Sequence, residues 1–271
     1  MSEPNEQNDT ETNEKSSEST IDLPLLTQIR KVSMEACEWS FPQLERQERI
    51  DLYETILRGS KREFDFIFLM LIATSIASIG LIQNNVAVVI GAMLLAPLMT
   101  PILGVSLSFV QGNRELVICS SLTTLVGFSL GILISVLLGS AFFANHITEE
   151  MLARGRPDIS DTFIALLSGM AAAYCKSRPH LTSSFAGVAI AAALVPPIAT
   201  IGLCLSFQEY EIAGNAAILF LTNVFSIILG ASLIFFAVGL RSRLASESHD
   251  SWVYIYFIKV ILLSVLLMFL V

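Results

Sequence analysis

The chain has 271 residues, of which 54% are hydrophobic and only 15% are charged, and its mean hydropathy is +0.68. A soluble domain carries about 25% Asp, Glu, Lys and Arg because its surface must stay hydrated, so this composition excludes a soluble globular protein and indicates an integral membrane protein. The net charge of −8 and the pI of 4.9, without a basic stripe, exclude nucleic acid as a partner.

The N-terminal part of the chain is polar. Residues 1–20 contain six acids, one lysine and a single apolar residue, so we predict a disordered acidic tail that cannot bury enough surface to fold. Residues 21–63 are predicted to form a cytoplasmic amphipathic helical segment, because apolar residues such as Tyr53 and Ile56 recur at helical spacing. This segment either leads the chain to the membrane or serves as a regulatory helix.

Seven apolar runs follow, and we predict that each crosses the membrane, since about 20 apolar residues span the hydrocarbon core. They cover residues 64–82, 86–110, 116–143, 162–175, 181–207, 212–240 and 252–271. The fourth run has only 14 residues and could also be a re-entrant piece. The fold class is therefore all-α, a polytopic transmembrane helical bundle whose only long extracytoplasmic loop is 144–161.

Basic residues are distributed unevenly between the two predicted sides. Ten lie on the side of the N-terminal segment, and two, Arg154 and Arg156, lie in the loop 144–161. Because short cytoplasmic loops carry the excess of Lys and Arg, this bias places the N-terminus in the cytoplasm. It also favours the fourth run as a true span, since omitting it would move Arg241 and Arg243 to the outside.

Residues 64–143 and 162–240 are predicted to be two membrane repeats, followed by a cytoplasmic loop and the seventh span in 241–271. At an offset of 100 residues, Pro97 coincides with Pro197 and Thr100 with Thr200. Each copy holds three spans, an odd number, so the second copy enters the membrane from the opposite side. The predicted arrangement is a 3+3 inverted repeat with broken helices, which is found in many secondary transporters.

Prolines interrupt the second and fifth spans at a depth that we expect to be mid-bilayer. Each proline frees a backbone carbonyl, and hydrocarbon offers that carbonyl no partner. The nearest hydroxyls are on threonines, and the sixth span contributes one deep amide. The candidate substrate-binding residues are Pro97, Thr100, Pro101, Pro196, Pro197, Thr200 and Asn223. An ordinary proline kink that is satisfied within the helix is the alternative.

The chain also resembles the hydrophobic membrane family known as domain of unknown function 389. The resemblance is carried by Ile90-Gly-Ala-Met-Leu-Leu-Ala-Pro-Leu-Met-Thr100, Gln111-Gly-Asn113, Arg156-Pro157, Leu194-Val-Pro-Pro-Ile198 and Leu221-Thr-Asn223. It implies a multi-pass protein of the prokaryotic cytoplasmic (inner) membrane. It implies no activity and assigns no catalytic or ligand residue.

Two further features have a functional and a plain interpretation. Small residues recur every fourth position on the third span, at Gly127, Gly131, Ser135 and Gly139, and this stripe either packs within the chain or forms a homo-oligomer seam. The outer-loop bases Arg154 and Arg156 either pair with nearby acids, Arg154 with Glu150 if one helical turn forms there, or screen ions electrostatically at an outer mouth.

The predicted spans lack the residues that an enzyme would need. They contain no pair of acids, and the three histidines lie in loops, so we expect no enzyme activity, no metal and no cofactor. The favoured hypothesis is a permease or channel for a small solute or ion at the paired proline breaks. The alternative is a non-transporting membrane scaffold or sensor that acts through its cytoplasmic N-terminal segment.

Overall fold

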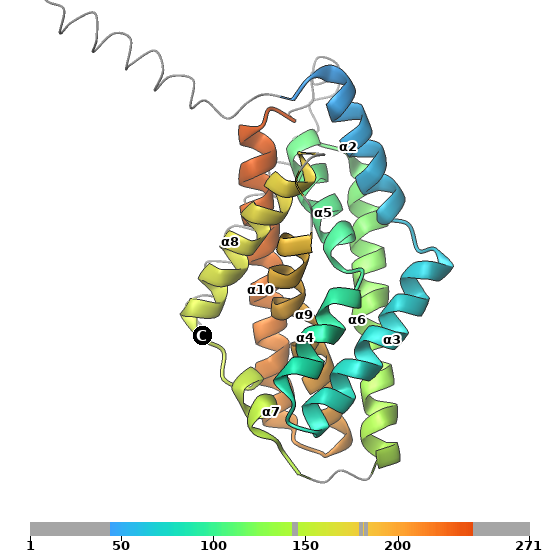
Figure 1. Ribbon diagram of the computed structural model, residues 1–271, viewed down its shortest axis with the longest axis vertical. Coiled ribbons are helices and arrows are strands. Elements are labelled where there is room, and N and C mark those ends of the chain that lie inside the picture. The colour runs from blue at the N-terminus through green and yellow to red at the C-terminus, as the bar shows by residue number, and fades with distance from the viewer. Residues whose placement is uncertain (1–43, 143–145, 179–180, 182–183, 241–271) are drawn as a thin grey trace, which may run out of the picture. The chain divides into compact units, whose positions relative to one another are not determined.

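A computed structural model of the chain describes residues 44–142, 146–178, 181 and 184–240. The predicted acidic tail, the first half of the predicted helical segment, the seventh run and Arg241 and Arg243 lie outside the described residues. The helices are α2 (Arg46–Gly59), α3 (Phe64–Ile82), α4 (Val86–Leu95), α5 (Met99–Gln111), α6 (Arg114–Phe142), α7 (Glu149–Arg154), α8 (Ile159–Lys176), α9 (Ser184–Ser206) and α10 (Tyr210–Ala237) (Figure 1). The all-α prediction is confirmed over this part of the chain.

Three of these helices, α3, α6 and α10, are long and apolar enough to cross a membrane. The pair α4 and α5, bent by 55° at a short break, counts as a fourth if it is one span. The predicted fourth run lies on α8, an 18-residue helix about 27 Å long at 1.5 Å per residue. The chain is a helical membrane protein with three or four such spans in its described part, where six of the seven predicted spans lie.

The helices run between two ends, which we name the α2 end and the α7 end. At the α2 end, the backbone N–H of Leu44 donates to Val238 O just after α10, and Asn113 Nδ2, between α5 and α6, donates to the Tyr53 hydroxyl on α2. At the α7 end, the Thr148 hydroxyl donates to Leu81 O at the close of α3. The end of α10 and the α5–α6 turn therefore lie at one end, and the end of α3 and the start of α7 lie at the other.

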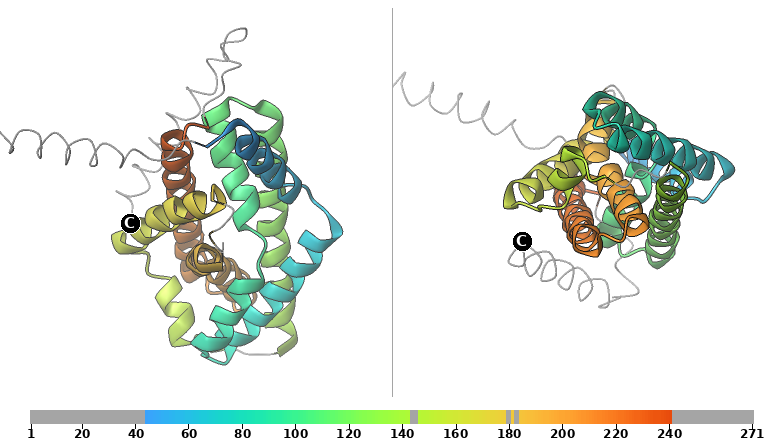
Figure 2. Two further views of the ribbon diagram at one scale, coloured as in Figure 1. Left: turned by 45° about the horizontal axis from the view of Figure 1, so that its top comes forward. Right: turned by 90° about the horizontal axis from the view of Figure 1, so that it is seen from below.

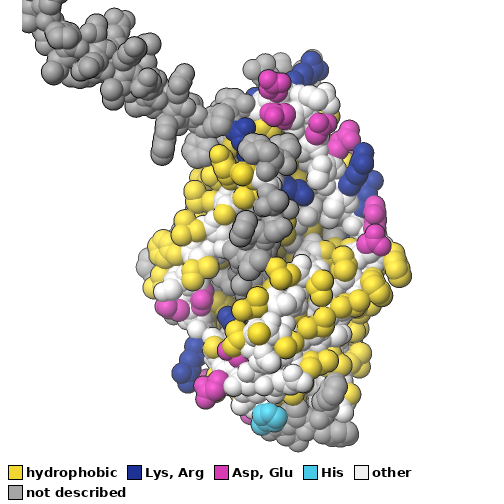
Figure 3. All heavy atoms as spheres, viewed as in Figure 1, with side chains coloured by type: hydrophobic (Ala, Val, Ile, Leu, Met, Phe, Trp, Pro, Cys, Tyr) yellow, Lys and Arg dark blue, Asp and Glu magenta, His cyan; other side chains and the backbone are white. Residues whose placement is uncertain are grey.

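The longest helix, α6, carries its large apolar side chains on the outside. Leu125, Leu133 and Leu137 are all more than half exposed, whereas the stripe Gly127, Gly131, Ser135 and Gly139 is buried. A helix of a water-soluble protein has the opposite pattern. Figure 3 shows hydrophobic side chains over α3 and charged ones over α2 above it. These exposed apolar side chains are suited to contact with lipid.

The buried stripe on α6 packs within the chain. A Cβ atom added to Gly127 would lie 2.8 Å from Leu98 and 3.0 Å from Phe66, and the Ser135 and Ser78 hydroxyls are hydrogen-bonded at 2.9 Å. Small residues let the neighbouring helices approach closely enough for these contacts. The stripe therefore packs against neighbours of the same chain, and a homo-oligomer seam at these four positions stays an untested prediction.

The two helices that carry the prolines are the central ones. Residues 101–108 of α5 and 194–204 of α9 are buried on every side, which is the pattern of a helix surrounded by others. Each packs against both α6 and α10, as the end-on view in Figure 2 illustrates. Each of the two helices thus packs against one helix of its own predicted half and one helix of the other half. An inverted repeat would produce this arrangement, although the repeat itself stays a prediction.

Candidate functional site

The backbone is broken where the sequence places Pro97. Ala96 has φ −71° and ψ 124°, the extended conformation that a proline favours in the residue before it. Pro97 has no N–H, so the carbonyl of Met93 loses its usual helical partner. Leu98 then begins α5 without a side-chain cap, which leaves N–H groups of the first turn of α5 without intrahelical acceptors. The break thus exposes both donors and acceptors of the main chain.

A hollow of about 250 Å³, the break hollow, opens beside this interruption. Its lining contains four charged and five apolar residues. It is lined by Arg58, Gly59, Lys61, Glu63, Asp65, Phe66, Leu69, Ala96, Pro97, Met99 and Thr100. Two of the predicted site residues, Pro97 and Thr100, therefore meet the connection between α2 and α3 at a space large enough for a small polar group.

The depth of the break can be measured against two neighbouring helices, α3 and α6. Leu98 and Phe66 flank the same glycine of α6, Gly127, so the break is level with the first turn of α3. If α3 crosses the hydrocarbon, the break is close to the face where α3 begins. Gly127 is also near the middle of α6 (Arg114–Phe142), so measured along α6 the break lies near mid-span, and its mid-bilayer depth stays a prediction.

The second proline pair produces no break. The helix α9 is continuous through Pro196 and Pro197, which corrects the prediction of two matching interruptions. Both prolines are buried within residues 194–204. Neighbouring helices enclose this stretch on all sides, and we attribute the continuity of α9 to that packing, which outweighs the local preference of proline for a helix end.

The two predicted threonines have different surroundings. Thr100 is half-buried and lies against Gly59 at the end of α2. Thr200 is fully buried, and its hydroxyl has no hydrogen-bond partner among the described residues. It therefore does not satisfy a carbonyl freed by the prolines. A buried hydroxyl without a partner costs about 1–3 kcal/mol, and Thr74 on α3 is in the same situation.

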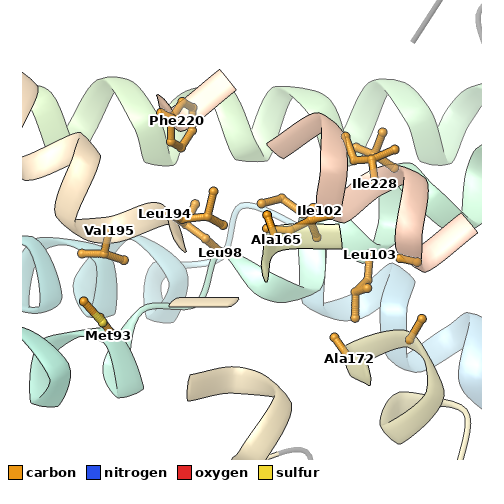
Figure 4. Packing of buried hydrophobic residues seen from close by; sticks show 14 of the residues in the cluster. Met93, Leu98, Ile102, Leu103, Ala165, Ala172, Leu194, Val195, Phe220 and Ile228 are labelled. Atoms are coloured by element: carbon orange, nitrogen blue, oxygen red, sulfur yellow. The ribbon is translucent and has the colours of Figure 1, made fainter. Parts of the chain in front are cut away.

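The remaining predicted residues lie inside the bundle. Pro101 is buried on α5, and Asn223 on α10 is 3% exposed, so this deep amide lies inside the protein. Between the break and α9, Leu98, Ile102 and Leu194 belong to one buried cluster and lie near each other in Figure 4. The break hollow reaches Pro97 and Thr100, whereas its lining does not include Pro196, Pro197 or Thr200.

Four charged residues of the break hollow were not predicted as site residues. Arg58 lies in the last turn of α2, Lys61 and Glu63 lie in the connection that follows, and Asp65 lies in the first turn of α3. In the sequence they resemble the ordinary charged flank of a membrane span. The signal that could have identified them is the presence of acids among the bases, since orientation alone requires only Lys and Arg. Thr74 gave no signal, because threonine is common in membrane helices.

A second hollow, the α2–α8 hollow, has a volume of about 380 Å³ at the α2 end. Glu48 and Asp51 of α2 line it together with Lys176 and Arg178 at the end of α8. Burial lowers the pKa of Lys176, because desolvation disfavours the charged amine. Acids and bases therefore face the same space from different helices.

The outer-loop arginines lie at the α7 end. Arg154 and Glu150 form an i,i+4 ion pair at 3.5 Å on α7, so the predicted local pairing is confirmed. The Arg154 side chain is 28% exposed, and its Nε is buried without a hydrogen-bond partner among the described residues. Arg156 is exposed. Only Arg156 is therefore placed to act on ions in the surrounding solution.

Comparison with known proteins gives a family without a described activity. The model of the family Domain of unknown function (DUF389) matches residues 93–229. An uncharacterized protein of Methanocaldococcus jannaschii is 30% identical over 198 residues, which cover 73% of this chain and 61% of that relative. The chain thus matches about three fifths of the length of this relative. No solved structure matches the chain.

Proposed function

We propose that this chain, which belongs to the family Domain of unknown function (DUF389), is a permease or channel. It passes a small solute or ion at the α4–α5 interruption, and the proposal rests on the geometry of this helix break. The carrying observation is the break hollow, which lies beside Pro97, where the helix is interrupted. Irregular backbone within a membrane protein is tolerated where it lines a cavity, and broken helices in inverted repeats mark many transport sites.

The proposed pathway runs from the break hollow toward the centre of the bundle. Leu98 and Leu194 close it there, so this arrangement corresponds to a state that is open at the α2 end and closed beyond the break. Thr74 and Thr200 have buried, unpartnered hydroxyls, and these are the groups that a solute or water would meet once the centre opened. We place the protein in the cytoplasmic membrane with the α2 end inside, and we assign it no enzyme activity.

Replacing Thr100 and Thr200 by valine distinguishes an effect on protein stability from an effect on flux. Thr200→Val keeps the shape and removes a buried hydroxyl that has no partner, so the variant should be as stable as wild type or more stable by about 1 kcal/mol. Its flux in liposomes should nevertheless fall several-fold. Thr100→Val should lower flux as well, because Thr100 lines the break hollow. Thermal unfolding and a flux screen over ions and small solutes measure the two effects.

The matched control is Thr222→Val. This threonine is also buried, but its hydroxyl donates to the carbonyls of Ile218 and Leu219 in its own helix, so the change should leave flux unaltered. Normal flux in both Thr100→Val and Thr200→Val, or the absence of any flux from the purified protein, would remove the basis of the permease proposal.

The alternative function is a membrane scaffold or sensor. It is favoured by the close packing of Leu98 and Leu194 at the centre and by the α2–α8 hollow, where α2 faces the end of α8. A ligand or partner held there would act through the N-terminal segment. Deleting residues 1–40 should abolish the whole cellular effect of a scaffold, whereas a permease should keep its flux.

Arg156 provides a prediction about ion selectivity. An exposed charge at the α7 end acts on ions through a screened field, so Arg156→Glu should change cation-over-anion selectivity about two-fold or more at 10 mM salt and little at 1 M salt. Reversal potentials in planar bilayers measure this selectivity. Arg154→Gln is the comparison, because Arg154 is already paired with Glu150; selectivity that stays the same in Arg156→Glu at both salt concentrations would contradict the role.

A further inference from the structure

The lining of the break hollow combines charged and apolar residues. Arg58, Lys61, Glu63 and Asp65 contribute two positive and two negative charges. Phe66, Leu69, Pro97 and Met99 contribute the apolar part. Such a combination suits an amphiphile with a charged head and an apolar body rather than a solute that is polar on all sides.

The charges around the hollow do not neutralise one another. In the described part of the chain, Arg58 pairs with Glu54 at 3.1 Å, whereas Lys61, Glu63 and Asp65 form no ion pair. Both signs are thus available to a ligand within one small space. The start of α5, with its uncapped N–H groups, adds partial positive charge near Thr100.

The hollow also lies next to the surface that faces lipid. Phe64 and Phe68 stack with their ring centroids 5.8 Å apart and are 75% and 48% exposed. They occupy the first turns of α3, between the charged turn and the apolar length of the helix. Figure 3 shows the boundary between charged and hydrophobic side chains in this region. A ligand in the hollow can therefore keep its apolar chains in the bilayer.

We propose that the break hollow binds the headgroup of a zwitterionic phospholipid that carries a primary ammonium, of the phosphatidylethanolamine type. The phosphate accepts hydrogen bonds from Lys61, Arg58 and the first-turn N–H groups of α5. The ammonium donates to the carboxylates of Glu63 and Asp65. The glycerol and acyl chains leave along Leu69 and the exposed phenylalanines. A volume of about 250 Å³ accommodates the headgroup and not the whole lipid.

This inference shares the hollow with the proposed permease but requires only that the protein is in a membrane. Lipid binding is therefore measured without flux. The purified full-length chain is exposed to equal amounts of phosphatidylethanolamine, phosphatidylcholine and phosphatidylglycerol with identical acyl chains, and retained lipid is counted by intact-protein mass spectrometry. We expect phosphatidylethanolamine to be retained at least about five-fold over the other two, because a quaternary ammonium cannot donate to a carboxylate and phosphatidylglycerol has no cation.

Variants that each remove one charge test which residue binds the ammonium and which binds the phosphate of the headgroup. Asp65→Asn should abolish the preference for phosphatidylethanolamine over phosphatidylcholine, whereas Lys61→Gln should lower the retention of all three lipids. Both side chains are exposed, so both variants should fold, which their unfolding temperatures check. The matched control is the pair Arg46→Gln and Glu115→Gln, which removes exposed charges outside the hollow and should leave the lipid preference unchanged.

Two results would overturn the inference. The first is equal retention of the three lipids by the wild-type chain, or an unchanged preference in Asp65→Asn. The second is displacement of bound phosphatidylethanolamine by an equal concentration of free phosphoethanolamine, which would show that a soluble ligand and not a membrane lipid is recognised. Loss of flux with intact lipid preference would instead contradict only the proposed permease.

Discussion

Replacing Gly169 by alanine is expected to destabilise the bundle by about 1–3 kcal/mol or more, because α8 and α10 approach each other there through their main chains. A Cβ atom on Gly169 would collide with the carbonyl oxygen of Ile227 and lie 2.7 Å from its Cα. A Cβ atom on Gly230 would likewise collide with the carbonyl of Leu166. Backbone atoms cannot rotate away as a side chain can, so the two helices must separate.

The measurement is the thermal unfolding temperature in detergent of Gly169→Ala beside a matched control. Gly214→Ala is made on α10 itself, at a position with no atom within 4 Å of the added Cβ. It should be neutral or stabilising by about 0.5–1 kcal/mol, because alanine is the better helix former. Equal unfolding temperatures for Gly169→Ala and Gly214→Ala would show that the helices do not cross as closely as described.

Leu98→Ala is expected to raise the flux of the protein more than ten-fold, if the proposed permease is correct. Leu98 is 2% exposed, follows Pro97 at the break and belongs to the same buried cluster as Leu194 on α9. Truncating a buried leucine costs about 2–5 kcal/mol in the state that buries it. If Leu98 is not buried in the open state, this cost applies only to the closed state and favours the open one. A change of about 1.4 kcal/mol in the free-energy difference between the two states changes the population of the open state about ten-fold.

The control for Leu98→Ala is Leu107→Ala on the same helix. Leu107 is also fully buried, but it lies more than two turns beyond the break and is not adjacent to Pro97. Both variants should lose similar stability, whereas only Leu98→Ala should leak solute from loaded liposomes. A similar leak in Leu107→Ala would show that loosening the bundle, rather than opening the break, causes the flux.

Much of the arrangement of helices was predictable from the sequence. The apolar run 64–82 coincides with α3, and the run 86–110 corresponds to α4 and α5 together. The break at Pro97 was predictable because proline removes an N–H and restrains the residue before it. The pairing of Arg154 with Glu150 also followed from their spacing, since residues four apart on a helix are neighbours.

The candidate site was only partly predictable. Pro97 and Thr100 line the break hollow as expected, but Pro196 and Pro197 lie in an unbroken helix. Proline within an apolar helix breaks the helix at Pro97 but not at Pro196 and Pro197. The reason is that α9 is enclosed by neighbouring helices, whereas the chain at Ala96 borders a hollow. The charges at Lys61 and Asp65 were visible in the sequence, but their convergence on Pro97 depends on how α2 packs against α5.

The sequence by itself determined the class of protein, the ends of most helices and one of the two proline effects. These follow from composition, from the number of apolar residues needed to cross hydrocarbon and from the covalent geometry of proline, none of which depends on neighbours distant in the chain. Three features followed only from the tertiary structure. Side chains of the same chain occupy the space beside Gly127 and Gly131, the buried Thr200 hydroxyl has no partner among the described residues, and the break lies level with the start of α3. Burial, depth and convergence depend on contacts between helices far apart in sequence, and those contacts are set by close packing of the whole bundle.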